Sequence, residues 1–395
     1  MEVYLDNSAT TKPYASVRNK MVQALDENYG NPSSMHRLGV NAEQLIREST
    51  SIIAGALKVE PKEIIYTSGG TEANNLALIG TALANRRRGN HIITTRIEHP
   101  SVHQPLVHLG ENGFNVDFAP VDKTGRLIKE SLYGLVNDNT LMVSIMYVNN
   151  EIGSVQEIDE LAAELKRIKK DIIIHVDAVQ AFGKYRIYPK RQNIDLLTFS
   201  GHKIHGPKGV GVLYVSESIR INPVVFGGGH QRNLRSGTEN VPGIAGIGQA
   251  VKEIYQDFDN KIARLYELKQ YFIRQLAGLE DVSIIGIPNE CSNEFEMEHL
   301  KKTAPHIINA CFEGVRSEVL LHALEDKGIY VSSGSACSSH HPTPSVTLSA
   351  IGLPKQLLDS TIRFSMSEMT TREEIDYTLE NISQLLPKLR RYTRR

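Results

Sequence analysis

A lysine in a glycine-rich turn has the clearest potential for covalent chemistry in this 395-residue chain. Lys203 ends the segment Ser200-Gly201-His202-Lys203, which follows the apolar run 194–199 and precedes the glycine-rich loop 206–211. The pattern predicts a buried strand that opens into a loop at the lysine. Burial and nearby positive charge would lower the pKa of the lysine, and a neutral amine can form a Schiff base with an aldehyde. An isolated Gly-His-Lys is more often a surface turn, so a partner residue is needed.

An aspartate upstream is a suitable partner. Asp177, in His-Val-Asp-Ala-Val-Gln, follows the apolar run 172–174, so a second buried strand is expected to end in a carboxylate. Such a carboxylate can keep the pyridinium nitrogen of pyridoxal phosphate protonated, which makes the ring an electron sink. Asp177 and Lys203 together therefore favour pyridoxal phosphate chemistry.

A loop in the first third of the chain is a candidate phosphate site. Residues 67–75 read Thr-Ser-Gly-Gly-Thr-Glu-Ala-Asn-Asn and join a predicted strand to a predicted helix, with Gly70 and Thr71 at the helix start. Backbone amides at a helix N-terminus bind phosphate, although an ordinary helix cap would look similar. The loop is not a nucleotide-binding motif of the Gly-Lys-Ser/Thr type, and the glycines of 243–248 lack dinucleotide-binding spacing. We expect the latter to let a helix pack closely, and a nicotinamide enzyme is disfavoured.

Three further polar residues follow predicted strands or lie within one. His99 and His103 are spaced to ligate a metal, but Pro100 predicts a helix start and no third ligand is evident. Stacking of the His99 ring on a flat cofactor is the favoured interpretation. Asn150 could bond the phenolic oxygen of the cofactor or the substrate, or simply form a turn. Arg363 lies in an apolar strand and needs a carboxylate, either structural or from an amino-acid substrate.

The three cysteines are too widely spaced to predict a disulfide framework or a paired-cysteine zinc site. Cys337 lies in the small-residue stretch 332–341, where an exposed thiol near cations can be nucleophilic, although an idle loop cysteine is the alternative. Cys311 lies in an apolar run and is expected to be a packed strand residue.

Strand-like runs alternate with helical periodicity, which predicts an α/β fold with a mostly parallel sheet and with ligands at the carboxyl ends of its strands. After about residue 255 the pattern changes to a long charged helix, short strands and a final helix. We predict a large domain over 15–255 and a smaller domain built from 1–14 and 256–395. The expected strands are 63–67, 91–95, 142–147, 172–176 and 196–199; the expected helices are 42–57, 72–86, 158–169, 260–276 and 371–390.

Composition excludes several functional classes. Lysine and arginine total 44 against 45 acidic residues, a net charge of −1, which does not favour nucleic-acid binding. Hydrophobic residues make up 41% of the chain, enough for a core, but no charge-free run approaches the length of a membrane helix. The N-terminus lacks the pattern of a signal peptide, so we expect a cytoplasmic protein.

With these residues assembled, the sequence resembles the cysteine desulfurase family of the NifS/IscS type, which are fold-type I pyridoxal phosphate enzymes. The resemblance runs from Tyr4-Leu-Asp-Asn-Ser-Ala-Thr-Thr11 to the last helix. Its motifs occur in family order: GNPSS, TSGGTEANN, EHP, VNNEIG, HVDAVQ, SGHKIHGPKG, GGGHQRNLRSGTEN, SSGSAC and IRFS. The fold implied is a large domain with a mostly parallel seven-stranded sheet and a smaller α+β domain.

The resemblance also implies a role for each site residue. Lys203 would hold the cofactor covalently, Asp177 would bond the ring nitrogen, Gln180 would contact the phenolic oxygen and His99 would stack on the ring. The phosphate would lie among Gly70, Thr71, Ser200 and His202, with Thr238 reaching the phosphate of the neighbouring subunit, which implies a homodimer. Arg363 and Asn150 would hold the substrate carboxylate.

The chemistry implied is removal of sulfur from L-cysteine to give alanine and a persulfide on Cys337. The length of the loop after Cys337 resembles that of the family members in which this cysteine is essential for cysteine turnover. The sulfur would pass to an acceptor protein for iron-sulfur cluster, thio-tRNA or thiamine synthesis, with no membrane or direct nucleic-acid contact. The loop 338–344 differs from that of the better-known iron-sulfur members, and their longer C-terminal extension is not seen after Arg395, so docking to a scaffold is not carried over. A selenocysteine lyase or cysteine-sulfinate desulfinase and a non-catalytic scaffold are the alternatives.

Overall fold

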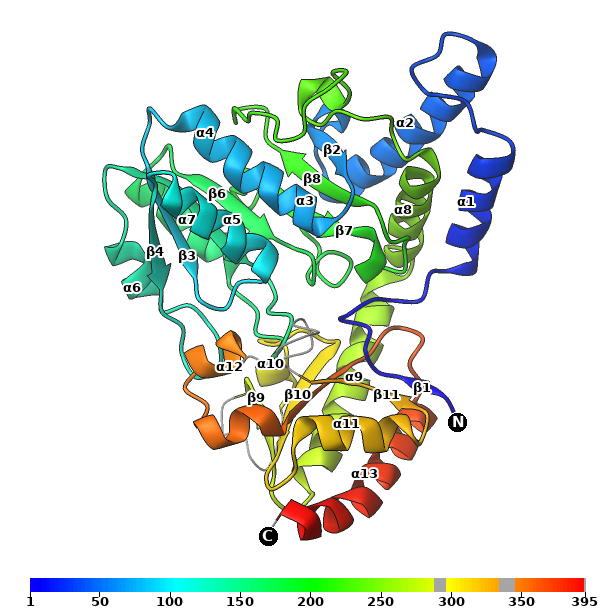
Figure 1. Cartoon of the computed structure of the whole chain (residues 1–395), viewed down its shortest axis with the longest axis vertical. Coiled ribbons are helices and arrows are strands. Elements are labelled where there is room, and N and C mark those ends of the chain that lie inside the picture. Colours follow the sequence, from blue (N-terminus) through cyan, green and yellow to red (C-terminus); the bar gives the residue numbers. More distant parts are fainter. Residues whose placement is uncertain (288–295, 334–344, 394–395) are drawn as a thin grey trace.

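A seven-stranded sheet forms the centre of the larger part of the molecule in the computed structural model, which describes residues 1–287, 296–333 and 345–393 (Figure 1). The strand order is β2-β8-β7-β6-β5-β3-β4. Strand β8 runs antiparallel to both of its neighbours, and the other neighbouring pairs are parallel. The expected mostly parallel α/β sheet is therefore confirmed. The strands are β2 Ile64–Thr67, β3 His91–Thr95, β4 Asn115–Ala119, β5 Thr140–Met146, β6 Ile173–Asp177, β7 Leu196–Ser200 and β8 Gly211–Val215.

Helices cover both faces of this sheet, so the strands bury side chains on both sides and read as nearly continuous apolar runs. Ile173 of β6 packs in the core beneath α3 to α5, whereas its neighbour Ile174 packs in the core beneath α2, α7 and α8. The helices are α1 Ala15–Asp26, α2 Arg37–Leu57, α3 Gly70–Asn75, α4 Thr81–Asn85, α5 Pro100–Glu111, α6 Lys129–Gly134, α7 Ile158–Ile168 and α8 Val241–Ile254.

The bounds of most predicted elements agree with the structure to within about three residues, and the two larger differences have local causes. Helix α2 begins five residues before the predicted start at 42, because the His36 side chain accepts a hydrogen bond from the Gly39 amide and caps the helix. Histidine is outside the usual set of capping residues, so the signal was not recognised. The predicted helix 72–86 is α3 and α4 joined by a π-helical turn, Leu76–Gly80.

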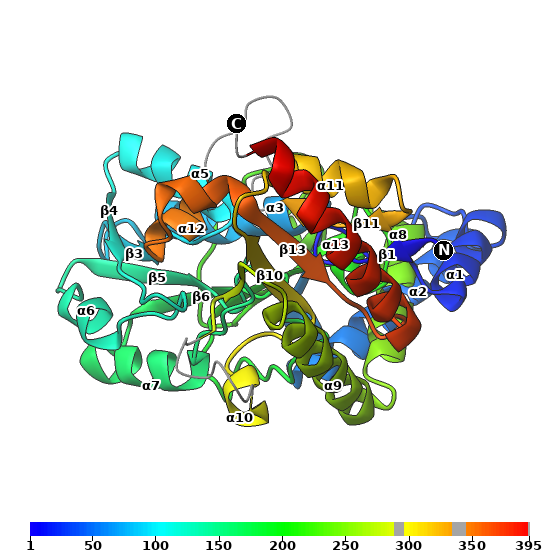
Figure 2. The same cartoon turned by 90° about the horizontal axis from the view of Figure 1, so that it is seen from below.

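A second, four-stranded sheet of order β12-β13-β10-β9 lies below the first in Figure 1. Its strand pairs are antiparallel, and helices α9 and α11 pack on it, as the view from below shows (Figure 2). Cys311 is fully buried in β10, as expected of a packed strand cysteine. The elements are α9 Phe258–Ala277, β9 Val282–Ile285, α10 Met297–Leu300, β10 Ile307–Phe312, α11 Ser317–Glu325, β12 Ser332–Ser333, α12 Val346–Ala350, β13 Thr361–Ser365 and α13 Arg372–Thr393.

The N-terminal segment lies at the junction of the two sheets (Figure 1). Strand β1, Val3–Tyr4, pairs with β11, Ile329–Tyr330, and Asp6 then bridges to Ser365 at the end of β13. Thr11 donates its backbone amide to the His202 carbonyl in the larger part, at 2.8 Å. The segment therefore bonds to both parts, and the predicted division at residues 14 and 255 stays a prediction. Among the residues the structure describes, no helix is long and apolar enough to cross a membrane.

The glycines of α8 permit close contact with α1 and α2, as the sequence predicted. A Cβ atom at Gly248 would lie 2.6 Å from the Ser49 Cβ and 2.8 Å from its Cα. A Cβ atom at Gly246 would lie 2.9 Å from the Met21 Cγ. Both distances are shorter than van der Waals contact, so the helices lie at a separation that only glycine allows.

We therefore expect Gly248→Ala to lower the free energy of unfolding by about 1–3 kcal/mol, because the added methyl group overpacks the α2–α8 contact. Gly55→Ala in α2 is the matched control, since a Cβ there meets nothing within 4 Å. The control should be neutral or stabilising by up to about 1 kcal/mol, the difference in helix propensity. Denaturant unfolding followed by circular dichroism measures both, and equal stability of the two variants would contradict the packing argument.

Candidate active site

A cavity of about 450 Å³ lies where the carboxyl ends of the large-sheet strands face the smaller part. Strands β2, β3, β5, β6 and β7 all end at this edge, since β2 and β7 are both antiparallel to β8 and therefore point the same way. All of the predicted site residues except Thr238 and Cys337 line the cavity: Gly70, Thr71, His99, Asn150, Asp177, Gln180, Ser200, His202, Lys203 and Arg363.

Asp177, the last residue of β6, is held by two donors. Its Oδ1 accepts from the Val179 amide at 3.0 Å, and its Oδ2 accepts from the Asn74 side chain at 2.9 Å. Asn74 is fully buried in α3, and its amide also donates to the Ser101 hydroxyl at 2.9 Å. Sequence reasoning missed Asn74, although a buried amide on a helix face that packs against a sheet is itself a signal for a polar partner.

His99 caps the N-terminus of α5, and its ring has a defined hydrogen-bond arrangement. Its Nδ1 accepts from the Ser101 amide at 3.1 Å and lies 2.8 Å from the Ser101 hydroxyl. Because Nδ1 is an acceptor, the neutral ring carries its proton on Nε2. Burial lowers the pKa of His99, and the charge of Asp177 partly opposes this effect. Asn74 and Ser101 thus connect the predicted stacking residue to the predicted ring-nitrogen ligand.

The metal interpretation of His99 and His103 gains no support from the geometry. The His103 ring lies 6.0 Å from the ring of Phe118, between centroids. In the described part of the chain, no group of three or more histidine, cysteine, aspartate or glutamate side chains is arranged to hold a metal ion.

Lys203 ends a short 3₁₀ turn after β7, and its ammonium group reaches the N-terminal segment. Its Nζ donates to the carbonyl oxygens of Ser8 and Ala9, the latter at 2.8 Å. Gln180 donates to the same Ser8 carbonyl at 3.0 Å. Residues 8 and 9 therefore close the cavity beside Lys203, a role that the sequence alone did not predict.

The start of α3 and the end of β7 also line the cavity, through Gly70, Thr71, Ser200 and His202. A Cβ atom at Gly70 would lie 2.9 Å from the Cγ2 atom of Val179, so only glycine lets the backbone at residue 70 approach the Val179 side chain this closely. The nearby His202 is neutral at physiological pH, because burial, followed by the charges of Lys203 and Lys208, lowers its pKa to about 4. Exposed backbone amides at a helix start, with a lysine, an aspartate and a flat imidazole, fit an aromatic aldehyde that carries a phosphate.

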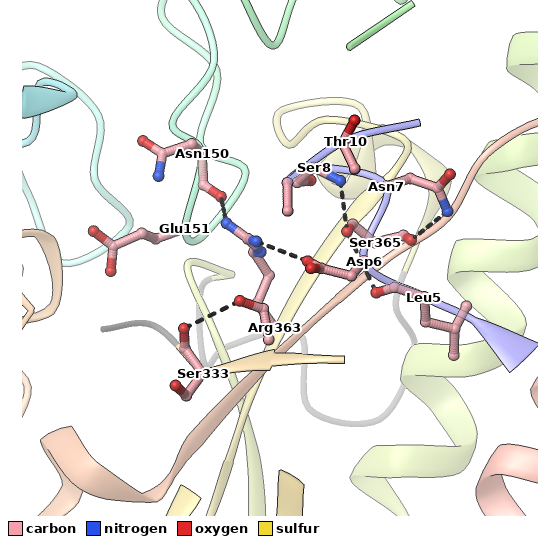
Figure 3. A network of polar contacts seen from close by, with 12 residues as sticks. Leu5, Asp6, Asn7, Ser8, Thr10, Asn150, Glu151, Ser333, Arg363 and Ser365 are labelled. Carbon is pink, nitrogen blue, oxygen red and sulfur yellow. Dashed lines mark hydrogen bonds and ion pairs between the residues drawn. The ribbon is translucent and has the colours of Figure 1, made fainter. Parts of the chain in front are cut away.

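Arg363 of β13 enters the cavity from the small sheet and is already paired (Figure 3). Its Nη2 donates to the Asp6 carboxylate at 2.9 Å, and its Nη1 donates to the Asn150 carbonyl at 2.9 Å. Burial raises the pKa of Asp6, and the Arg363 charge opposes the rise. Of the two carboxylates considered for this arginine, the structure supplies the internal one, and the guanidinium still faces the cavity.

Two glutamates in the cavity wall, the buried Glu98 and the half-buried Glu151, were not singled out by sequence. Glu98 accepts from the Thr95 hydroxyl at 2.7 Å and the Met146 amide at 3.1 Å. Burial raises the pKa of Glu98 to about 8. Burial also raises the pKa of Glu151, whose carboxylate accepts from the Ser345 hydroxyl. Both lie next to residues that the sequence did select, His99 and Asn150.

Two predicted site residues are not among those that line the cavity. Thr238 is exposed and does not line the cavity of its own chain. Cys337 lies outside the described residues. Ser332 and Ser333, which precede it in sequence, line the cavity, and Ser345 beyond it bonds to the cavity residue Glu151.

Comparison with known proteins identifies a family. The family model for aminotransferase class V matches residues 3–378. The chain is 40% identical over 389 residues to "Cysteine desulfurase IscS" of Dictyoglomus turgidum, covering 98% of this chain and 95% of that protein. It is 42% identical over 395 residues to "Cysteine desulfurase IscS" of Proteus mirabilis, covering 99% and 94%. A solved structure described as a "NifS-like protein" superposes with a TM-score of 0.90 at 35% identity, covering 98% of this chain and all of that chain.

We expect the His99 ring to be neutral at pH 7, with its proton on Nε2, because burial lowers its pKa. Asp177→Asn should lower the pKa further, since Asp177 is the negative charge that opposes the effect of burial. Nuclear magnetic resonance of ¹⁵N-histidine protein measures both properties, with His99→Gln to assign the signal. A His99 pKa that rises in Asp177→Asn would contradict this electrostatic account.

Proposed function

The chain belongs to the class-V aminotransferase family, and we propose that within it the protein is a cysteine desulfurase that converts L-cysteine to L-alanine and an enzyme persulfide. One observation supports the proposal most strongly. A single cavity gathers a lysine, an aspartate, a histidine and an arginine from separate elements. Ser332 and Ser333, which also line it, immediately precede in sequence the segment that contains Cys337.

The proposed cofactor is pyridoxal phosphate, which when bound supplies an electron sink for negative charge at the substrate Cα. We assign Lys203 to the aldehyde, Asp177 to the ring nitrogen, Gln180 to the phenolic oxygen and His99 to the ring face. The phosphate is assigned to Gly70, Thr71, Ser200 and His202. In this assignment Asn74 keeps the Asp177 carboxylate in place, and the neutral His99 can donate from its Nε2–H.

Arg363 and Asn150 are the proposed carboxylate site for the substrate. Arg363 suits this role because a planar guanidinium binds a carboxylate through two parallel hydrogen bonds. Its side chain is only 8% exposed, so a carboxylate bound there is largely removed from water. The other end of the amino acid then faces Lys203 and His99.

Cys337 is the proposed sulfur acceptor within the enzyme. Its thiolate attacks the substrate sulfur, a sulfur–sulfur bond forms, the carbon–sulfur bond breaks, and the electron pair left on carbon takes up a proton to give alanine. Cys337 follows Ser333 by four residues, so covalent geometry keeps its Cα within about 15 Å of the Ser333 Cα. Since Ser333 lines the cavity, the required approach is within the reach of the chain.

We also propose a homodimer and an acceptor protein. Thr238 is exposed on its own chain, which suits a residue assigned to the phosphate of the partner subunit. The persulfide sulfur would pass to a protein that builds iron-sulfur clusters, thiolated tRNA or thiamine.

Alanine release from L-cysteine in the presence of a reductant tests the function. We expect the intact protein to release alanine. The rate of release by Cys337→Ser should be at least about 100-fold lower, because the hydroxyl is a far weaker nucleophile for sulfur. Cys291→Ser is the matched control for removal of a thiol and should retain the rate. Equal alanine release by Cys337→Ser would instead favour a selenocysteine lyase or cysteine-sulfinate desulfinase.

Borohydride reduction tests the cofactor assignment independently of turnover. We expect the protein loaded with pyridoxal phosphate to lose its visible absorbance and to gain the mass of the reduced cofactor on the peptide containing Lys203, because reduction fixes the lysine–aldehyde bond. The Lys203→Ala variant should not be labelled. Lys208 is an exposed lysine in the same loop, and the Lys208→Ala variant should still be labelled. Labelling elsewhere in the intact protein would refute the assignment of Lys203.

A further inference from the structure

Arg363 and Asp6 form an ion pair inside the proposed substrate site, although 357 positions separate them in the sequence. We propose that Asp6 is a positioning residue, which orients the Arg363 guanidinium and limits how tightly the site binds amino-acid carboxylates. This inference rests on the proposed function, in which the substrate and the product alanine both carry the carboxylate.

The geometry fixes the guanidinium in one orientation (Figure 3). Asp6 accepts from Nη2 and the Asn150 carbonyl accepts from Nη1, each at 2.9 Å. Nε is buried and has no hydrogen-bond partner. A guanidinium has five N–H groups, so both terminal nitrogens keep one N–H for a ligand. Asp6 and Asn150 thus set the direction in which the remaining N–H groups point.

Asp6 is itself held by the strand that carries the arginine. Asn7 donates its side chain to the Ser365 carbonyl at 2.9 Å, and the Ser8 amide donates to the Ser365 hydroxyl at 2.8 Å. Arg363 and Ser365 are two positions apart in β13, so they share one face of the strand. The N-terminal segment therefore contacts both side chains on that face, and Asp6 cannot move away from Arg363 without breaking these bonds.

The electrostatic consequence follows from burial. The Arg363 side chain is 8% exposed and that of Asp6 is 21% exposed, so water screens their charges poorly. A ligand carboxylate on the same guanidinium must share its positive charge with Asp6 and is repelled by the Asp6 charge. Among the described residues, Asp6 is the only carboxylate within ion-pair distance of Arg363. Glu151, which also lies near Arg363, is engaged instead with the Ser345 hydroxyl.

Weaker carboxylate binding is useful in this reaction. L-Cysteine and L-alanine present the same carboxylate and amine, so tighter binding at Arg363 would hold the substrate and the product equally. Uniform binding of this kind lowers KM without raising kcat, and it slows product release. Asp6 weakens the binding of the carboxylate that substrate and product share, and it keeps the Arg363 guanidinium oriented.

The test compares wild-type enzyme loaded with cofactor with Asp6→Asn, which keeps the shape of the side chain and removes its charge. We expect the dissociation constant for L-alanine, measured by spectroscopic titration, to fall about tenfold, equivalent to about 1.4 kcal/mol. KM for L-cysteine should fall with it, and kcat should not rise. L-Alaninol, which lacks the carboxylate, should bind both proteins within about twofold, since it makes no charge contact with Arg363.

Two further variants keep the inference falsifiable. Asp6→Ala also removes the charge and should bind L-alanine more tightly than wild type, but less tightly than Asp6→Asn, because Nη2 loses its orienting acceptor. Ser365→Ala removes the hydrogen bond from the Ser8 amide and leaves the charges of Asp6 and Arg363 in place. It therefore measures how far a looser N-terminal segment changes L-alanine binding by itself.

Unchanged or weaker L-alanine binding in both Asp6 variants overturns the inference, as does tightening of the same size in Ser365→Ala or with L-alaninol. If wild type neither binds L-alanine nor releases it from L-cysteine, the proposed function fails instead. The two failures are therefore distinguishable.

Discussion

The direction of strand β8 is the constraint on which the site depends. Because β8 is antiparallel to both β2 and β7, those two strands run the same way as β3, β5 and β6. Five strands therefore end at one edge, and each is followed there by residues that line the cavity. Asp177 ends β6, Lys203 follows β7, and His99 follows β3. Reversal of β2 would move Gly70 and Thr71 to the far edge and leave the cavity without a helix N-terminus.

The N-terminal segment supplies what the sheet edge lacks. Carbonyl oxygens of Ser8 and Ala9 accept from Lys203, the Ser8 carbonyl also accepts from Gln180, and the Asp6 carboxylate accepts from Arg363. Three side chains of the proposed site, which come from two different sheets, thus have their partners within four consecutive residues. A displacement of the small sheet relative to the large one would change all of these contacts together, so the segment couples the substrate end of the cavity to the lysine end.

The sequence was informative where function coincides with a local pattern. Lys203 and Asp177 each follow an apolar run, and such runs predict strands whose carboxyl ends face ligands, so both positions could be found without a structure. Asn74 could not be found in this way, because its partners Ser101 and Asp177 lie 27 and 103 positions away. For Arg363 the residue pattern left a structural and a substrate carboxylate open, and only the family resemblance pointed to the substrate, since hydrogen-bond partners at long separation leave no periodic signal. Helix α2 started early for a similar reason, as a histidine cap is not a recognised local pattern.

Burial determines which groups in the cavity keep a charge. Desolvation disfavours the charged form of a group removed from water, and it therefore raises the pKa of Glu98 and Glu151 and lowers the pKa of His99 and His202. All four shifts move these groups toward neutrality near pH 7. Burial raises the pKa of Asp6 as well, but the charge of Arg363 and its hydrogen bond to Asp6 oppose the rise. In the proposed site, the carboxylate of a bound amino acid would meet the charges of this pair. The strength of carboxylate binding is then set by how far Asp6 has already satisfied Arg363, so one residue near the N-terminus controls a property of the whole site.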